Sequence, residues 1–282
     1  MNPATDSPLS LARALAEATR AGLARMDAQM LLLHLMGQDS HARAWLIAHD
    51  DQLLSSEQHQ RWDELVRQRL RGMPVAYLTG GKDFYGLRLQ VDARVLDPRP
   101  DTETLVDWAL ELIPANTPCR AADLGTGSGA IALALKSQRP HAEIWAVDAS
   151  ADALAVARAN ALRLGLPVQF AQGDWLEPLA GQGFDLIASN PPYIRADDPH
   201  LAALRHEPLP ALASGADGLD DIRRIARQAP ACLRAGGWLL LEHGWDQAED
   251  VARILGAAGF TGIAHRQDLA GITRCTGGRL PT

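Results

Sequence analysis

The sequence predicts an α/β fold, with a mostly parallel sheet that ends in an antiparallel edge hairpin and is preceded by a small all-α domain. Three observations support this prediction. Strand and helix patterns alternate over roughly the last 180 residues, the last two strand patterns have no helix between them, and the first seventy residues show helical patterns only. Such alternation is typical of a parallel sheet covered by helices on both faces.

Residues 1–72 are predicted to form a domain of helices separated by glycine stops. In the first helix, Asp6 or Ser7 could cap the N-terminus, and Pro8 suits the first turn. The predicted helical segments are 6–22, 24–37, 40–51 and 55–72. The last of them carries apolar residues at helical spacing, namely Trp62, Leu65, Val66 and Leu70.

Residues 73–100 change in character and are predicted to form a β-hairpin linker. A Gly-Gly turn is followed by the alternating apolar residues Leu87, Leu89 and Val91, and then by prolines. This leaves residues 101–282 as the α/β domain.

The α/β domain begins with a helical pattern at 101–113. Its predicted strands are 120–125, 143–148, 168–172, 184–189, 237–244, 261–267 and 272–278. Its other predicted helices are 130–138, 151–165, 219–233 and 245–259. Ligands bind such sheets at the carboxyl ends of the strands, close to the point where strand order reverses, so the informative residues should directly follow strands.

Composition and charge disfavour several classes of protein. The net charge is −7; residues 1–72 carry 8 basic and 9 acidic groups, and residues 121–282 carry 14 and 18, which argues against a nucleic-acid binder. We expect a cytoplasmic protein without a membrane segment, because no run of 18 apolar residues occurs and the start lacks the features of a signal peptide. The three cysteines are far apart and fit neither a disulfide framework nor a metal site.

The first strand of the α/β domain ends in the glycine-rich stretch DLGTGSG. Gly125, Gly127 and Gly129, with Thr126 and Ser128 between them, allow a sharp turn and a close approach of a ligand to the backbone at a helix N-terminus. The G-x-G-x-G spacing differs from the G-x-G-x-x-G of dinucleotide-binding folds. The alternative is a tight strand-to-helix turn without a ligand.

The next two strands end in residues suited to a nucleoside. Asp148 could accept hydrogen bonds from both ribose hydroxyls, or it could cap the following helix, a role that Ser150 could share. Trp175 could cover an adenine ring, and Asp174 or nearby backbone groups could bind its amino group; alternatively, Trp175 could belong to the core. Together these residues predict a cofactor that contains adenosine.

The fourth strand leads into Asn190, Pro191, Pro192 and Tyr193. Because proline has no N–H, this segment offers mainly rigid acceptors, which suit a substrate that donates hydrogen bonds, such as a planar –NH₂ group. Tyr193 could lie against that planar group. The alternative is a proline-rich turn that only ends the strand.

DLGTGSGAIAL, AVD, GDW and SNPPYI together resemble the class I methyltransferases, which have a Rossmann-like sheet and use S-adenosyl-L-methionine to methylate planar nitrogens. The Asn-Pro-Pro-Tyr motif is shared by enzymes that act on adenine and on protein glutamine. The segments FYGLRLQVDARVLDPRPDTETLVDWAL, HEPLPAL, ADGLDDIRRI, GGWLLLEHGWDQ and DLAGITRCTGGR resemble the release factor glutamine methyltransferase family. One departure is Asp97, where that family commonly has an apolar residue.

This resemblance implies methylation of N5 of the glutamine in the Gly-Gly-Gln motif of class I peptide chain release factors. It assigns the cofactor to Gly125, Thr126, Gly127, Ser128, Gly129, Asp148, Trp175 and Asn190, and the glutamine to Asn190, Pro191, Pro192 and Tyr193. Thr102 and Glu103 would wall the pocket near the reacting methyl group. The helical domain would contact the release factor, and no metal, membrane or direct nucleic-acid substrate is implied.

Three alternatives remain open from the residues alone. A glutamine methyltransferase of a ribosomal protein would share the same catalytic segment. An adenine-N6 methyltransferase of DNA or RNA is disfavoured by the acidic balance, and an adenosyl-cofactor binder without catalysis or a nicotinamide oxidoreductase is disfavoured by the glycine spacing and the intact Asn-Pro-Pro-Tyr motif. His243, at the end of a buried strand, is interpreted as structural rather than as a catalytic base.

Overall fold

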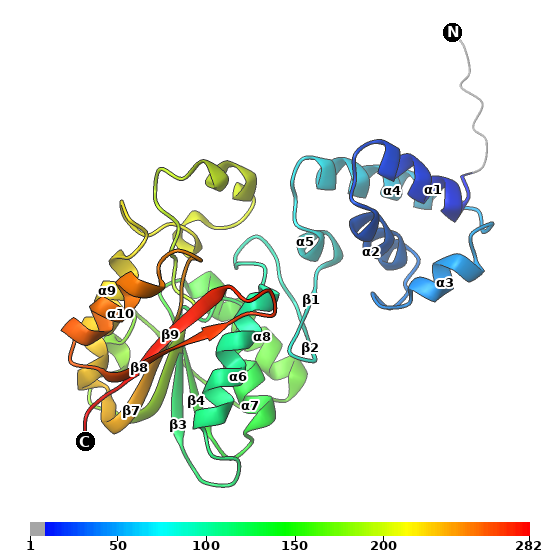
Figure 1. Cartoon of the computed structure of the whole chain (residues 1–282). Helices are drawn as coiled ribbons and strands as arrows, with labels where there is room; N and C mark the ends of the chain where they lie inside the picture. Colours follow the sequence, from blue (N-terminus) through cyan, green and yellow to red (C-terminus); the bar gives the residue numbers. More distant parts are fainter. Residues whose placement is uncertain (1–8) are drawn as a thin grey trace. The chain divides into compact units, whose positions relative to one another are not determined.

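The computed structural model describes residues 9–282 and divides the chain into two compact units, Met1–Gly80 and Gly81–Thr282 (Figure 1). The helix cap expected at Asp6 or Ser7, and Pro8, lie outside the described residues. Each unit is described by itself. Within residues 9–282 no helix is long and apolar enough to cross a membrane.

The N-terminal unit is helical, and its helices pack around one apolar core. Ser10 caps the first helix by accepting a hydrogen bond from the Arg13 N–H at 3.4 Å, and Ser55 and Gln58 form a capping box on the fourth. Of the apolar residues at helical spacing in the fourth helix, Trp62 and Leu65 are buried. The helices are α1 (Leu11–Arg20), α2 (Arg25–Leu35), α3 (Arg43–Ala48), α4 (Ser56–Leu70) and α5 (Val75–Thr79).

The segment predicted as a hairpin linker contains a helix as well as a hairpin. Gly80, the first residue of the expected Gly-Gly turn, ends α5 with a left-handed φ of 69°. The hairpin pairs β1 (Lys82–Phe84) with β2 (Leu87–Leu89). Its turn lies at Tyr85 and Gly86, with φ of 49° and 75°, because a two-residue hairpin turn of type I′ requires positive φ at both positions.

The C-terminal unit is a seven-stranded sheet between two layers of helices (Figure 1). Its strands are β3 (Arg120–Leu124), β4 (Glu143–Asp148), β5 (Gln169–Gln172), β6 (Phe184–Ser189), β7 (Leu233–Glu242), β8 (Thr261–Gln267) and β9 (Thr273–Arg279). Their order is β5-β4-β3-β6-β7-β9-β8, and β9 alone runs in the direction opposite to the other six strands. The predicted mostly parallel sheet with an antiparallel edge hairpin is confirmed.

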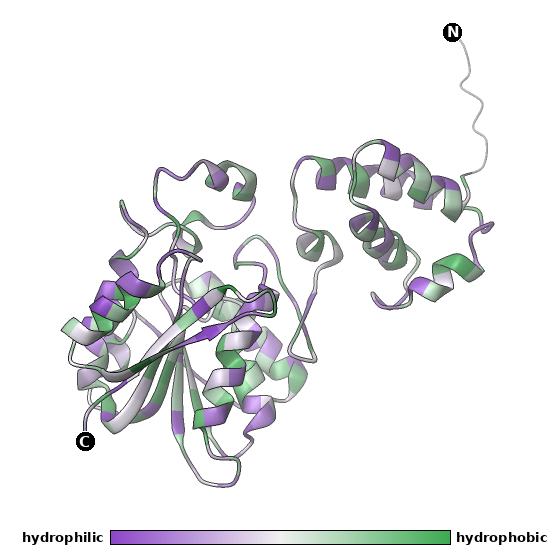
Figure 2. Cartoon of the chain, in the orientation of Figure 1, coloured by the Kyte–Doolittle hydropathy of each residue, from purple (hydrophilic) through white to green (hydrophobic). Residues whose placement is uncertain are grey.

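Helices cover both faces of this sheet. On one face lie α6 (Glu103–Leu112), α7 (Ala130–Gln138) and α8 (Ala151–Leu164), and on the other lie α9 (Asp220–Gln228) and α10 (Ala248–Ala257). Figure 2 shows mostly hydrophobic residues along α6 and the central strands, as burial between layers requires. All three cysteines are buried free thiols.

Strand register brings the carboxyl ends of four strands to one edge of the sheet. Leu124 pairs with Val147 on one side and with Ser189 on the other, and Ser189 also pairs with Leu241. Strand order reverses between β3 and β6. The glycine loop, Asp148, Asn190 and Glu242 therefore meet at the edge where this class of sheet binds ligands.

Candidate active site

The glycine loop after β3 borders a cavity of about 460 Å³. Gly125 and Gly127 line it with positive φ, and a Cβ on Gly125 would lie 3.2 Å from a ring carbon of Trp175. Gly129 does not line the cavity; a Cβ there would lie 3.0 Å from a Leu133 methyl carbon. The first two glycines thus leave the cavity wall free of side chains, and the third permits close helix packing.

The two polar residues inside the loop are buried and hold its backbone. The Thr126 hydroxyl donates to Asp123 Oδ2 at 2.6 Å, and the Ser128 carbonyl accepts a hydrogen bond from Asn160 Nδ2 at 3.0 Å. Burial raises the pKa of the Asp123 carboxyl to about 7. Thr126 and Ser128 do not line the cavity, so they shape the loop from behind.

Asp148 ends β4 and lines the same cavity. Its Oδ2 accepts the Gly127 N–H and its Oδ1 accepts the Ser150 N–H, both at 2.9 Å. The cap of α8 is Ser150, whose hydroxyl oxygen accepts the Ala153 N–H at 3.2 Å. Because each carboxylate oxygen can accept a second hydrogen bond, Asp148 retains acceptor capacity for a diol.

Asp174 and Trp175, after β5, form another wall of the cavity. Trp175 has a positive φ of 53°, and its indole N–H donates to Asp221 Oδ1 at 3.2 Å. Trp175 also packs against the hydrophobic core of the sheet, so it belongs both to the core and to the cavity wall. Asp174 forms an ion pair with Arg224.

Asn190, directly after β6, lines the large cavity and also a smaller one of about 100 Å³. Its Nδ2 donates to the Thr102 hydroxyl oxygen at 3.1 Å, which leaves Oδ1 as a free acceptor. Tyr193 lines the small cavity and Pro192 the large one. Pro191 is buried and lines neither.

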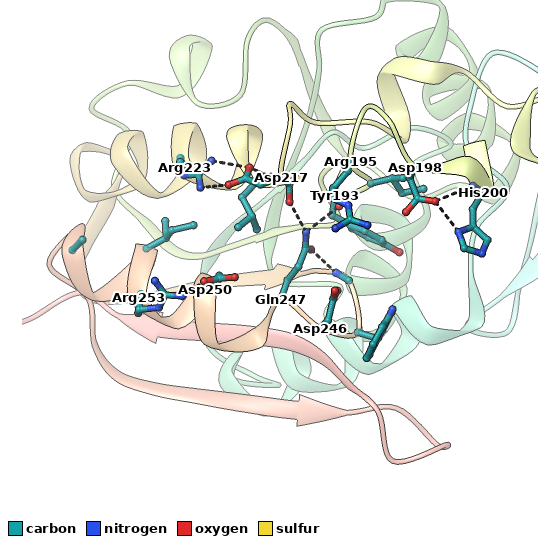
Figure 3. Close-up of a pocket in the computed structure, with 16 residues that line it drawn as sticks. Tyr193, Arg195, Asp198, His200, Asp217, Arg223, Asp246, Gln247, Asp250 and Arg253 are labelled. Carbon is teal, nitrogen blue, oxygen red and sulfur yellow. Dashed lines mark hydrogen bonds and ion pairs between the residues drawn. The ribbon is translucent and has the colours of Figure 1, made fainter. Parts of the chain in front are cut away.

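The backbone at Tyr193 is held from the opposite side by Gln247 (Figure 3). Gln247 Nε2 donates to the carbonyls of Tyr193 at 3.1 Å and Asp217 at 3.2 Å, while its Oε1 accepts the Gly244 N–H at 2.8 Å. A hollow of about 970 Å³ opens on this side, and Arg223 and Asp217 form an ion pair in its wall.

The Tyr193 hydroxyl stays protonated, because burial and then the charge of Glu242 raise the pKa of Tyr193 well above its usual range.

The segment before α6 contributes Leu96 to both cavities and Arg99 to the small one. Arg99 Nη2 pairs with Glu207 Oε1 at 2.6 Å, and Glu207 Oε2 accepts the Asp97 N–H at 3.2 Å. Asp97 lines neither cavity, and its charge is compensated by Lys82 at 3.2 Å. The residue that departs from the family pattern therefore lies outside both cavity walls.

Comparisons with known proteins identify relatives of both units. Residues 103–206 match the methyltransferase small domain, and residues 9–80 match the PrmC N-terminal domain. The release factor glutamine methyltransferase of Xylella fastidiosa (strain Temecula1) is 50% identical over 278 residues, or 98% of each chain. That of Escherichia coli (strain K12) is 45% identical and covers 90% of this chain and 92% of its own.

The chain belongs to the release factor glutamine methyltransferase family. Among solved structures, the Thermus thermophilus 16S rRNA N2 G1207 methyltransferase in complex with AdoMet and guanosine shares the fold. It is 18% identical with a TM-score of 0.53, over 71% of this chain and 49% of that one. The predicted class I methyltransferase sheet, preceded along the chain by a small all-α N-terminal domain, is confirmed.

The structure also shows the contacts of three further residues that were considered from the sequence. Thr102 contacts Asn190 through the hydrogen bond described above. Glu103, expected to wall the pocket, instead accepts the Tyr85 N–H at 2.8 Å and lines neither cavity, because the hairpin turn uses its carboxylate. His243 is fully buried with both ring nitrogens bonded, to the Gly244 carbonyl and the Thr276 hydroxyl, which agrees with a structural role.

Sequence reasoning missed three residues that lie next to the candidate site residues: Glu207, Glu242 and Gln247. Glu207 and Gln247 bind segments that are distant in sequence, so no local pattern marks them. Glu242 did carry a signal, since a charged residue directly follows the apolar run of a central strand at the ligand-binding edge. The adjacent His243 was considered as a candidate base, whereas Glu242 was not considered.

Proposed function

We propose that this chain transfers a methyl group from S-adenosyl-L-methionine to the side-chain amide nitrogen (N5) of the glutamine in the Gly-Gly-Gln motif of class I peptide chain release factors. The observation that carries the proposal is the fixed Asn190 carboxamide, which lies between a large and a small cavity with its oxygen free to accept. Membership of the family supports the choice of glutamine over adenine.

The large cavity is the proposed cofactor site, and its residues fit that group. S-adenosyl-L-methionine supplies an electrophilic methyl group to the reaction. Asp148 has the acceptor capacity for the ribose hydroxyls, Trp175 offers an aromatic face for adenine, and Gly125 and Gly127 leave room beside the backbone.

The small cavity is the proposed site for the glutamine amide. An amide nitrogen is a weak nucleophile because its lone pair is delocalised into the carbonyl, so orientation matters most. Asn190 Oδ1 accepts one amide hydrogen, and the Tyr193 ring packs on the amide plane. The Pro191 carbonyl is proposed for the second hydrogen on the sequence pattern alone, since Pro191 lines neither cavity. These acceptors also stabilise the positive charge that develops on the nitrogen.

The N-terminal unit is proposed to contact the release factor at a distance from the tripeptide. A cavity of about 100 Å³ holds one side chain and little more, so a stable complex needs further contact area. A translation factor as substrate also implies that the protein works in the cytoplasm.

The substrate assignment can be tested with radiolabelled S-adenosyl-L-methionine. We expect label in a release factor and none in its Gly-Gly-Ala variant, in a ribosomal-protein fraction or in DNA. Label in ribosomal protein alone would favour the sister activity on ribosomal glutamine, and label in DNA alone would refute a glutamine substrate.

The role of Asn190 can be tested separately. Asn190→Ala is expected to lower kcat on the release factor about 100-fold or more, because an oriented hydrogen-bond acceptor is lost. Cofactor binding should persist. Asn116→Ala, at an exposed asparagine, is the control and should leave kcat unchanged. Lost cofactor affinity with normal turnover per bound complex would contradict the assignment.

A further inference from the structure

A buried carboxyl group lies behind the proposed glutamine site and has no part in the mechanism described so far. Glu242 is the last residue of β7, next to the strand end that carries Asn190. Its side chain is 1% exposed, and it lines neither the cofactor cavity nor the small cavity. It therefore touches neither proposed substrate directly.

An ordinary structural ion pair does not account for this group. Within residues 9–282 no basic side chain forms an ion pair with Glu242, and its Oε2 has no hydrogen-bond partner. The nearby Arg274 pairs instead with Asp101 at 3.2 Å and Asp268 at 3.0 Å. Burying an unpaired carboxyl group costs stability, so its presence at this position calls for another explanation.

The hydroxyl groups of Thr102 and Tyr193 lie within hydrogen-bonding reach of Glu242. The Thr102 oxygen already accepts from Asn190 Nδ2, so its single proton is available to the carboxyl group. The protonated Tyr193 hydroxyl can donate to the same carboxyl group. Glu242 therefore lies beside the hydroxyl group that holds the Asn190 carboxamide and beside the hydroxyl group of Tyr193.

We propose that Glu242 is a positioning residue that fixes both walls of the glutamine site, the Asn190 carboxamide through Thr102 and the Tyr193 ring through its hydroxyl. This inference rests on the proposed function. With its Nδ2 tied to Thr102, the Asn190 side chain presents Oδ1 rather than Nδ2 to the substrate. The ring is held at one angle, so neither wall needs to reorganise when the amide enters.

Two substitutions of Glu242 distinguish a positioning role in the glutamine site from a role in stabilising the fold. Glu242→Leu keeps a similar size but removes the acceptor, and it should lower kcat on the release factor on the order of 10- to 100-fold, as a misplaced reacting group does. The cofactor Kd and the melting temperature should stay close to wild type, because the substitution also removes an unpaired buried oxygen. Glu242→Gln keeps a carbonyl acceptor and should restore most of the activity.

An NMR measurement in the absence of the release factor detects the environment of the Asn190 carboxamide directly. The chain has four asparagines, so the side-chain amide signals of ¹⁵N-labelled asparagine can be assigned with Asn190→Ala. Glu242→Leu should shift the Asn190 signal and leave that of Asn160, whose Nδ2 bonds the Gln90 and Ser128 carbonyls. A wild-type chain that does not methylate the factor would refute the proposed function but leave this result intact.

Two outcomes would overturn the inference. One is an unshifted Asn190 signal with wild-type kcat in Glu242→Leu. The other is a parallel loss of kcat, cofactor affinity and melting temperature in both Glu242→Leu and Glu242→Gln, which would show that the group serves the fold alone.

Discussion

Asp148 shows how a single residue serves both the fold and the proposed cofactor site. Its two oxygens accept backbone N–H groups from the glycine loop and from the start of α8, at 2.9 Å each. The same carboxylate lines the large cavity. A side chain bonded in this way is immobile before a ligand arrives, so little conformational entropy remains to be lost when the ligand binds.

Asp148→Ala is expected to weaken binding of S-adenosylhomocysteine about 10- to 100-fold, since charge-assisted hydrogen bonds contribute roughly 1.5–3 kcal/mol. At saturating cofactor, kcat should change much less. Isothermal calorimetry and initial rates measure the two effects. Asp152→Ala, at an exposed carboxylate in the first turn of α8, is the control. An unchanged Kd in Asp148→Ala would rule out the ribose role.

At the scale of elements, the loop before α9 packs against the segment after β6. Gly218 has a φ of 77°, and a Cβ on it would lie 2.2 Å from the Tyr193 carbonyl oxygen. That carbonyl is also the acceptor for Gln247. The position of the Asn-Pro-Pro-Tyr segment therefore depends on a glycine that is distant in sequence.

Gly218→Ala should displace the Tyr193 carbonyl and lower kcat more than about tenfold, as a small misplacement near the reacting group does. Gly181→Ala is the matched control, because its φ of 75° is similar but no atom lies within 4 Å of the added Cβ. The control should lose only about 1–2 kcal/mol of stability, the cost of left-handed backbone, with normal kcat. Chemical denaturation and initial rates test the pair, and equal kcat in the two variants would refute the packing argument.

The elements that the sequence predicted well are those with a strong local pattern. Strand β8 (Thr261–Gln267) and helix α7 (Ala130–Gln138) match their predicted bounds, because alternation and helical spacing are visible within a few residues. Helix α5 was missed, since five residues are too short to show periodicity. Leu70, expected on the apolar face of α4, is 46% exposed, because its place in a helical pattern does not decide what covers it.

The candidate site was predictable only where its residues end a strand or directly follow one. Asp148 ends β4, Gly125 and Asn190 directly follow β3 and β6, and strand register brings them together. The pairs that brace them join distant segments: Arg99 and Glu207 are 108 residues apart, and Asn190 and Thr102 are 88 apart. Such contacts depend on the completed fold, so one sequence without its structure does not reveal them.

At the scale of the whole molecule, the chemistry and the second contact surface are assigned to different units. Every residue of the proposed cofactor and glutamine sites belongs to Gly81–Thr282. The N-terminal unit has an apolar core of its own, which includes Leu11, Leu31 and Trp62. Each unit therefore meets the requirement for folding independently.

A fragment of residues 81–282 should fold, bind S-adenosylhomocysteine with the affinity of the full chain, and methylate a short Gly-Gly-Gln peptide at the same rate. On an intact release factor its KM should rise about tenfold or more, because the second contact and the avidity that it adds are lost. Circular dichroism confirms folding, and peptide and factor kinetics are compared in the fragment and the full chain. An unchanged KM for the intact factor would show that the N-terminal unit does not bind it.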